Sequence, residues 1–115
     1  MKSRYDNEME LQFVSKSRNE AFARITVAAF AAQLDPTIEE LADIKTAVSE
    51  AVTNCIVHAY EDTEGIVKLR ATLLNNILEI EIYSVVGIGT KVIMKKRIKK
   101  EDNEIIEEEK NALIN

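Results

Sequence analysis

The stretch TIEELADIKTAVSEAVTNCIVHA, residues 37–59, carries the strongest periodic signal in the chain. Its apolar residues recur at steps of three and four, at Leu41, Ile44, Val48, Ala51, Cys55 and Ala59. This spacing places them on one face of a helix of about five turns. Thr37 and Glu40 form a capping box, in which each side chain satisfies a backbone N–H left free by the helix start. The stretch therefore predicts a long helix with one buried face.

A second helix is predicted immediately before it, over residues 17–34. Ser17 and Glu20 form another capping box at its start. The run is rich in alanine, and we expect its buried stripe to consist of Phe22, Ile25, Ala29 and Ala32. Pro36 then stops the helix, because the residue before a proline avoids the helical region.

Segments that alternate between apolar and polar residues predict strands at 8–14, 67–73, 78–82 and 90–97. Asn75-Asn76 fits a two-residue hairpin turn, since Asn tolerates a positive φ. The order of the elements predicts an α+β fold, a two-layer α/β sandwich with a mixed, mostly antiparallel sheet and both helices on one face. We expect one domain over residues 1–98. A charged tail over 99–115 changes abruptly from basic to acidic, which favours a solvated, frayed helix.

The composition excludes several classes of protein. The chain has 115 residues, 46% of them apolar, and a net charge of −5, which is typical of one globular domain. A single cysteine, Cys55, excludes an internal disulfide framework and a cysteine-based zinc site, and a single histidine, His58, excludes a multi-histidine metal site. The acidic balance argues against direct binding of nucleic acid. Without an apolar run of membrane-spanning length or a signal-like start, we expect a cytoplasmic protein that does not contact a membrane.

Glu50, Asn54 and His58 follow one another at steps of four, along one flank of the predicted long helix. A carboxylate can act as a general base, and an Asn carbonyl oxygen can ligate Mg²⁺. The spacing alone is a weak pattern, however. On that evidence the three residues are more simply explained as polar positions at the rim of a well-capped helix.

Glu20 and Arg24 stand at i and i+4, the favourable orientation for a helix ion pair worth about 0.2–0.5 kcal/mol. The alternative is a charged spot on an exposed helix face that recognises a partner. Cys55 is expected in the core as an inert thiol. Gly87-Ile-Gly89 lacks a following helix and a Lys-Ser/Thr pair, so it is not a phosphate-binding loop of the P-loop kind.

A longer set of residues resembles a known family. The set comprises FAR (22–24), AAQLDPT (31–37), EL (40–41), IKT (44–46), VSEAVTN (48–54) and HAY (58–60). Together they are similar to the anti-sigma F factors of spore-forming bacteria. These are small serine kinases of the GHKL ATPase/kinase superfamily, with a Bergerat-type ATP-binding fold. The similarity runs from about Glu8 to Tyr83 and resumes from Ser84 to Arg97, so it covers most of the chain.

The resemblance implies a nucleotide site that takes ATP or ADP with Mg²⁺. Glu50 corresponds to the family's catalytic carboxylate, and Asn54 corresponds to its Mg²⁺-ligating residue. His58 falls near the phosphates, and Thr90 matches the residue that closes the adenine end of the pocket.

The resemblance also implies partners. Glu20 and Arg24 fall on the helix that the family uses to engage a sporulation sigma factor, which is thereby kept from RNA polymerase. The family acts as a cytoplasmic homodimer and phosphorylates a serine of a small anti-anti-sigma factor.

The chain departs from the family at one junction. After the position of Tyr83 the family continues with a glycine box that reads the adenine, a mobile ATP lid and a second glycine box, and none of these precedes Ser84 here. The alternative interpretation is therefore a catalytically inactive, nucleotide-free module that binds its partner through Glu20 and Arg24. The helices and sheet can survive the change, because the segment 84–89 is long enough to turn a hairpin.

Overall fold

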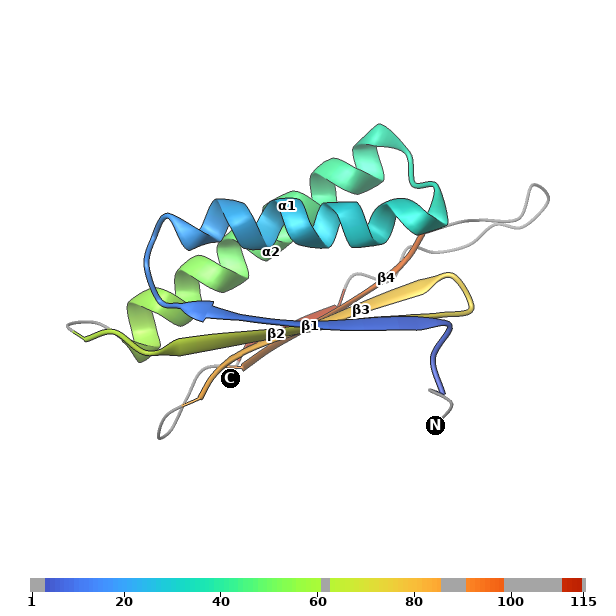
Figure 1. Cartoon of the computed structure of the whole chain (residues 1–115). Coiled ribbons are helices and arrows are strands. Elements are labelled where there is room, and N and C mark those ends of the chain that lie inside the picture. Colours follow the sequence, from blue (N-terminus) through green and yellow to red (C-terminus); the bar gives the residue numbers. More distant parts are fainter. Residues whose placement is uncertain (1–3, 61–62, 86–90, 99–110, 115) are drawn as a thin grey trace.

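The computed structural model describes residues 4–60, 63–85, 91–98 and 111–114. Its elements are β1 (Asn7–Val14), α1 (Asn19–Ala31), a 3₁₀ turn (Ala32–Leu34), α2 (Ile38–Ala59), β2 (Ile66–Leu74), β3 (Ile77–Ser84), β4 (Lys91–Arg97) and β5 (Asn111–Ile114). Both helices lie on one face of a single sheet, as Figure 1 shows. The predicted α+β fold of two layers is confirmed.

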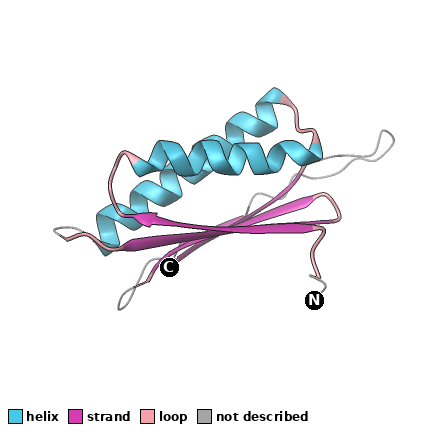
Figure 2. Cartoon of the chain, viewed as in Figure 1, coloured by secondary structure: helices cyan, strands magenta, loops and turns pink. Residues whose placement is uncertain are grey.

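The sheet has the strand order β1-β2-β3-β4-β5, and every pairing among the described residues is antiparallel. Figure 2 shows the strands of this sheet in magenta beneath the two helices in cyan. The turn between β2 and β3 is the predicted one. Asn75 and Asn76 have φ values of 52° and 65°, and Leu74 and Ile77 pair on either side of them. Two consecutive positive φ values are typical of the tight turns whose twist matches that of a hairpin.

Helix α2 begins as the sequence predicts. The backbone N–H of Glu40 donates to Oγ1 of Thr37 over 3.0 Å, and the backbone N–H of Thr37 donates to Oε1 of Glu40 over 2.9 Å. The predicted capping box is therefore confirmed. The buried face of α2 includes Ile44, Val48 and Cys55, which pack on the inward side chains of the sheet.

Helix α1 begins differently from the prediction. It starts at Asn19, its N-cap residue is Arg18, and no side chain caps it. The capping box of Ser17 and Glu20 is therefore wrong. The physical reason is that the Glu20 carboxylate turns to α2, where it accepts a hydrogen bond from Ser49.

The buried face of α1 is also different from the expected stripe. Phe22 and Ile25 are 52% and 60% exposed, and Ala29 and Ala32 are exposed as well. The residues that face the core are Ala23, Val27 and Ala31, and Ala28 is buried as well. Small side chains at these positions allow α1 to approach α2 and the sheet closely. The helical period was predicted correctly, but its orientation was not.

The described end of the tail is a strand rather than a helix. Asn111–Ile114 forms β5, which pairs with the outer edge of β4, with Ala112 opposite Met94. These four uncharged residues fill the open edge of the sheet, whereas the charged segment that favoured a frayed helix, 99–110, lies outside the described residues. The proposed boundary between the domain and the tail, at residue 98, stays a prediction.

Candidate functional site

Glu50, Asn54 and His58 lie along one flank of α2, because the predicted helix forms without interruption. Successive members are one turn apart, a rise of about 6 Å. Glu50 and His58 are exposed, and Asn54 is half-buried. The flank borders the buried face of the helix, so polar atoms stand beside the apolar core.

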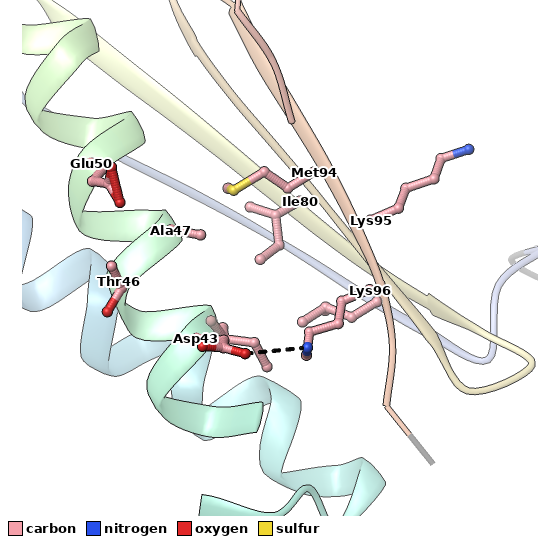
Figure 3. A pocket seen from close by; sticks show the side chains of 10 residues that line it. Asp43, Thr46, Ala47, Glu50, Ile80, Met94, Lys95 and Lys96 are labelled. Carbon is pink, nitrogen blue, oxygen red and sulfur yellow. Dashed lines mark ion pairs between the residues drawn. The ribbon is translucent and has the colours of Figure 1, made fainter. Parts of the chain in front are cut away.

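A pocket of about 200 Å³ opens between α2 and strands β3 and β4. It is lined by Asp43, Ile44, Thr46, Ala47, Glu50, Leu78, Ile80, Met94, Lys95 and Lys96. In Figure 3, Ala47 on the helix points toward Ile80 and Met94 on the sheet, whereas Lys95 points away. Glu50 is the predicted site residue that lines this pocket. Asn54 and His58 continue along the helix beyond it.

A buried lysine closes one end of this pocket. The side chain of Lys96 is 7% exposed, and its Nζ lies 3.6 Å from Oδ2 of Asp43 on α2 (Figure 3). A buried ammonium needs a partner of opposite charge. Sequence reasoning missed this pair. The signal was available, however, because Lys96 continues the inward alternation of Val92 and Met94.

The described residues contain no group of three or more metal-ligating His, Cys, Asp or Glu side chains. Mg²⁺, however, usually takes only one or two protein ligands and completes its shell with phosphate oxygens and water. The side-chain oxygen of Asn54, half-buried on the flank of α2, fits that kind of site. Thr90, the residue predicted at the adenine end, lies outside the described residues.

The junction between Tyr83 and Ser84, at which the chain departs from the family, lies within strand β3. Strand β3 runs through Tyr83 and Ser84, and Tyr83 pairs with Lys91 at the start of β4. The Oη of Tyr60 donates to the carbonyl of Ile66 over 2.7 Å and accepts from the backbone N–H of Val85 over 3.0 Å. Tyr60 thus ties the end of α2 to β2 and to the residue that follows β3. Strands β3 and β4 pair antiparallel, while most of the turn predicted over 84–89 lies outside the described residues.

Glu20 and Arg24 are brought together as the sequence predicts. Nε of Arg24 lies 3.2 Å from Oε2 of Glu20, with the two side chains 38% and 25% exposed. The same carboxylate oxygen accepts a 2.5 Å hydrogen bond from Oγ of Ser49 on α2. Sequence reasoning missed Ser49, since a contact between residues 29 positions apart has no local signature.

The sole cysteine is a core residue. Cys55 is fully buried, and desolvation raises its pKa to about 11. A thiol with a raised pKa is a poor nucleophile, because the thiolate is the reactive form. The prediction of a buried Cys55 is confirmed. None of the described helices is both long enough and apolar enough to span a membrane.

Comparison with known proteins agrees with this fold. Residues 13–96 match the model of the histidine kinase-like ATPase domain. Proteins named anti-sigma F factor are similar in sequence. That of Caldanaerobacter subterraneus subsp. tengcongensis is 70% identical over 78 residues, which are 68% of this chain and 54% of the relative. That of Clostridium kluyveri is 58% identical over 89 residues, 77% of this chain and 62% of the relative.

The anti-sigma F factor of Clostridium acetobutylicum is 53% identical over 90 residues, 78% of this chain and 62% of the relative. The chain therefore spans only 54% to 62% of the length of these curated relatives. The resemblance to the anti-sigma F factors of the GHKL superfamily is confirmed. The matched domain covers most of the chain, which belongs to the histidine kinase-like ATPase family.

Proposed function

We propose that this chain is an anti-sigma factor that binds a sigma factor through α1. The observation that carries the proposal is the outer face of that helix. Phe22 and Ile25 are exposed on that helix, and the partly exposed Arg24 lies about 100° around the helix from Ile25. An arginine next to exposed apolar groups is typical of a protein interface, and the names of the similar proteins specify the kind of partner.

We further propose that α2 carries serine-kinase chemistry directed at an anti-anti-sigma factor. ATP supplies the phosphoryl group when it is bound. Glu50 accepts the proton of the substrate hydroxyl or orients it, which its exposed carboxylate can do at the rim of the pocket. Asn54 would hold Mg²⁺ through its carbonyl oxygen, and His58 would lie near the phosphates, while Thr90, outside the described residues, would be the residue at the adenine end. The family membership of the chain supports this assignment.

The kinase proposal is tested by Glu50→Ala, assayed for transfer of phosphate from Mg·ATP to a serine of an anti-anti-sigma factor. Transfer should be lost, while sigma-factor binding should be unchanged. Glu39→Ala is the matched control, because Glu39 is an exposed carboxylate on the same helix, one turn before the pocket. Equal transfer by Glu50→Ala and the wild-type chain would remove Glu50 from the mechanism.

A second candidate function is a nucleotide-free module that binds its partner without chemistry. The uninterrupted pairing of β3 with β4 favours it, because the sheet is complete with Tyr83 directly opposite Lys91. The mass of the purified chain is measured first, because a mass of 13.0 kDa corresponds to a chain without the family's lid and glycine boxes. Isothermal titration with Mg·ATP then separates the two functions. Heat released on Mg·ATP binding supports the kinase. No heat from Mg·ATP, together with retained binding of the sigma factor, supports the nucleotide-free module.

We also propose that the protein acts as a homodimer in the cytoplasm. The exposed side chains of Phe22 and Ile25 would be available to a second copy as well as to a different partner. Sedimentation equilibrium of the free chain tests the proposal. A monomer at micromolar concentration would contradict it.

A further inference from the structure

The Glu20 carboxylate links the two helices through a single atom. Its Oε2 accepts the 2.5 Å hydrogen bond from Ser49 on α2 and also lies 3.2 Å from Nε of Arg24 on α1. Ser49 directly precedes Glu50 in the chain. One oxygen atom therefore joins the proposed partner face to the residue next to the proposed catalytic carboxylate.

Arg24 is held only loosely in this arrangement. In the described part of the chain, its Nε is the one buried side-chain nitrogen or oxygen without a hydrogen-bond partner. The 3.2 Å contact with Glu20 is thus an ion pair without hydrogen-bond geometry. A partner carboxylate that offers two aligned oxygens to the guanidinium would form a stronger, bidentate pair. Arg24 can therefore be withdrawn from Glu20 at little cost.

We propose that Ser49 is a positioning residue that couples the partner face of α1 to Glu50. The inference rests on the proposed function, since it takes Arg24 as a partner contact and Glu50 as the catalytic carboxylate. When Arg24 turns to a partner, Glu20 keeps Ser49 as its remaining contact across the helix interface. Ser49 and Glu50 are about 100° apart around a rigid helix. A pull on Ser49 toward α1 therefore rotates Glu50 relative to the pocket.

The coupling must also act in the reverse direction, because linkage between two sites is reciprocal. Without the Ser49 hydroxyl, the Glu20 carboxylate can turn fully to Arg24 and form an aligned ion pair. A partner would then have to compete harder for the guanidinium. Loss of Ser49 is therefore expected to weaken partner binding although Ser49 itself does not contact the partner.

The first test is a double-mutant cycle in the full chain, read by the backbone amide NMR signals of α2. Arg24→Ala should shift the Glu50 amide signal. In a Ser49→Ala background, the change that Arg24→Ala causes in the Glu50 amide signal should fall below half of its value in the wild-type background. In a Ser49→Thr background, which keeps the hydroxyl, the change should persist. Thr53→Ala removes an exposed hydroxyl from the same helix and is the matched control. It should leave the shift caused by Arg24→Ala unchanged.

The second test adds a sigma F factor as the probe partner. Ser49→Ala should raise its Kd at least about threefold, within the range of couplings between residues of one network. Ser49→Thr should restore the wild-type Kd. Equal Glu50 shifts in the wild-type and Ser49→Ala backgrounds would overturn the inference. If the wild-type chain does not bind the sigma factor, the proposed function fails instead, and the NMR cycle in the free chain still decides the coupling.

Discussion

Gly65→Ala should destabilise the fold by driving the Tyr60 ring out of its place. A Cβ at residue 65 would stand 2.0 Å from Cε1 and 2.5 Å from Cζ of Tyr60. The ring is 6% exposed and is anchored by the two hydrogen bonds of its hydroxyl to Ile66 and Val85. It must therefore retreat by more than an ångström within a packed core.

The expected cost follows from these contacts. Overpacking of a core costs about 1–3 kcal/mol, and loss of one hydroxyl hydrogen bond adds about 1 kcal/mol. Gly65→Ala should thus lower the free energy of unfolding by about 2–4 kcal/mol, a large share of the roughly 5–15 kcal/mol typical of a domain. Urea unfolding measures the change. Amide hydrogen exchange at Val85 should also accelerate, since its N–H donates to Tyr60.

The control is the same substitution in a Tyr60→Leu background, where the ring that causes the clash is gone. There Gly65→Ala should cost less than about 0.5 kcal/mol, the size of an ordinary surface effect. If Gly65→Ala costs the same in both backgrounds, or less than about 0.5 kcal/mol with Tyr60 present, the clash does not determine the stability at this site.

Thr37→Ala should cost about 1 kcal/mol of stability in urea unfolding, whereas Ser17→Ala should be near neutral, because only Thr37 caps a helix with its side chain; equal losses would refute this assignment of the caps. Arg24→Ala should change the free energy of unfolding by no more than about 0.5 kcal/mol but weaken sigma-factor binding at least about tenfold, equivalent to 1.4 kcal/mol. Arg24→Lys should recover part of that loss. Native affinity in Arg24→Ala would show that Arg24 forms only an ordinary helix ion pair with Glu20. The raised pKa of Cys55, about 11 against an ordinary 9.0, means that the folded state holds the thiol proton more tightly than the unfolded state. Its contribution to stability is therefore complete below pH 9 and is lost as the pH rises through about 11; a Cys55→Ala chain with the same pH profile would contradict this.

Local chemistry explains why so much of α2 and the hairpin was predictable. The capping box of Thr37 and Glu40 joins residues three positions apart, and the turn at Asn75 and Asn76 depends on the backbone freedom of those two residues. The spacing of Glu50 and Asn54 likewise follows from the helical period. Interactions between residues no more than one helical turn apart depend on the local sequence alone, and the local sequence therefore predicts them.

The orientation of α1 was decided by packing. Both of its faces are apolar, so the period alone does not say whether Phe22 or Val27 faces the core. Space at the interface with α2 selected the smaller side chains and left Phe22 and Ile25 outside. Which of two apolar faces is buried depends on the volume that the neighbouring elements leave, and that volume does not exist before they pack.

The long-range polar contacts were likewise settled by the tertiary structure. Glu20 meets Ser49, and Asp43 meets Lys96, only because α2 crosses beside α1 and over β4. The sequence by itself determined that two helices and the strands β1 to β4 form, and it placed Glu50 on one flank of α2. Only the tertiary structure placed the ion pair of Asp43 and Lys96 at the end of the pocket and the hydroxyl of Ser49 against the Glu20 carboxylate. Contacts between residues distant in sequence depend on how the helices and the sheet pack, and not on the periodicity of any one segment.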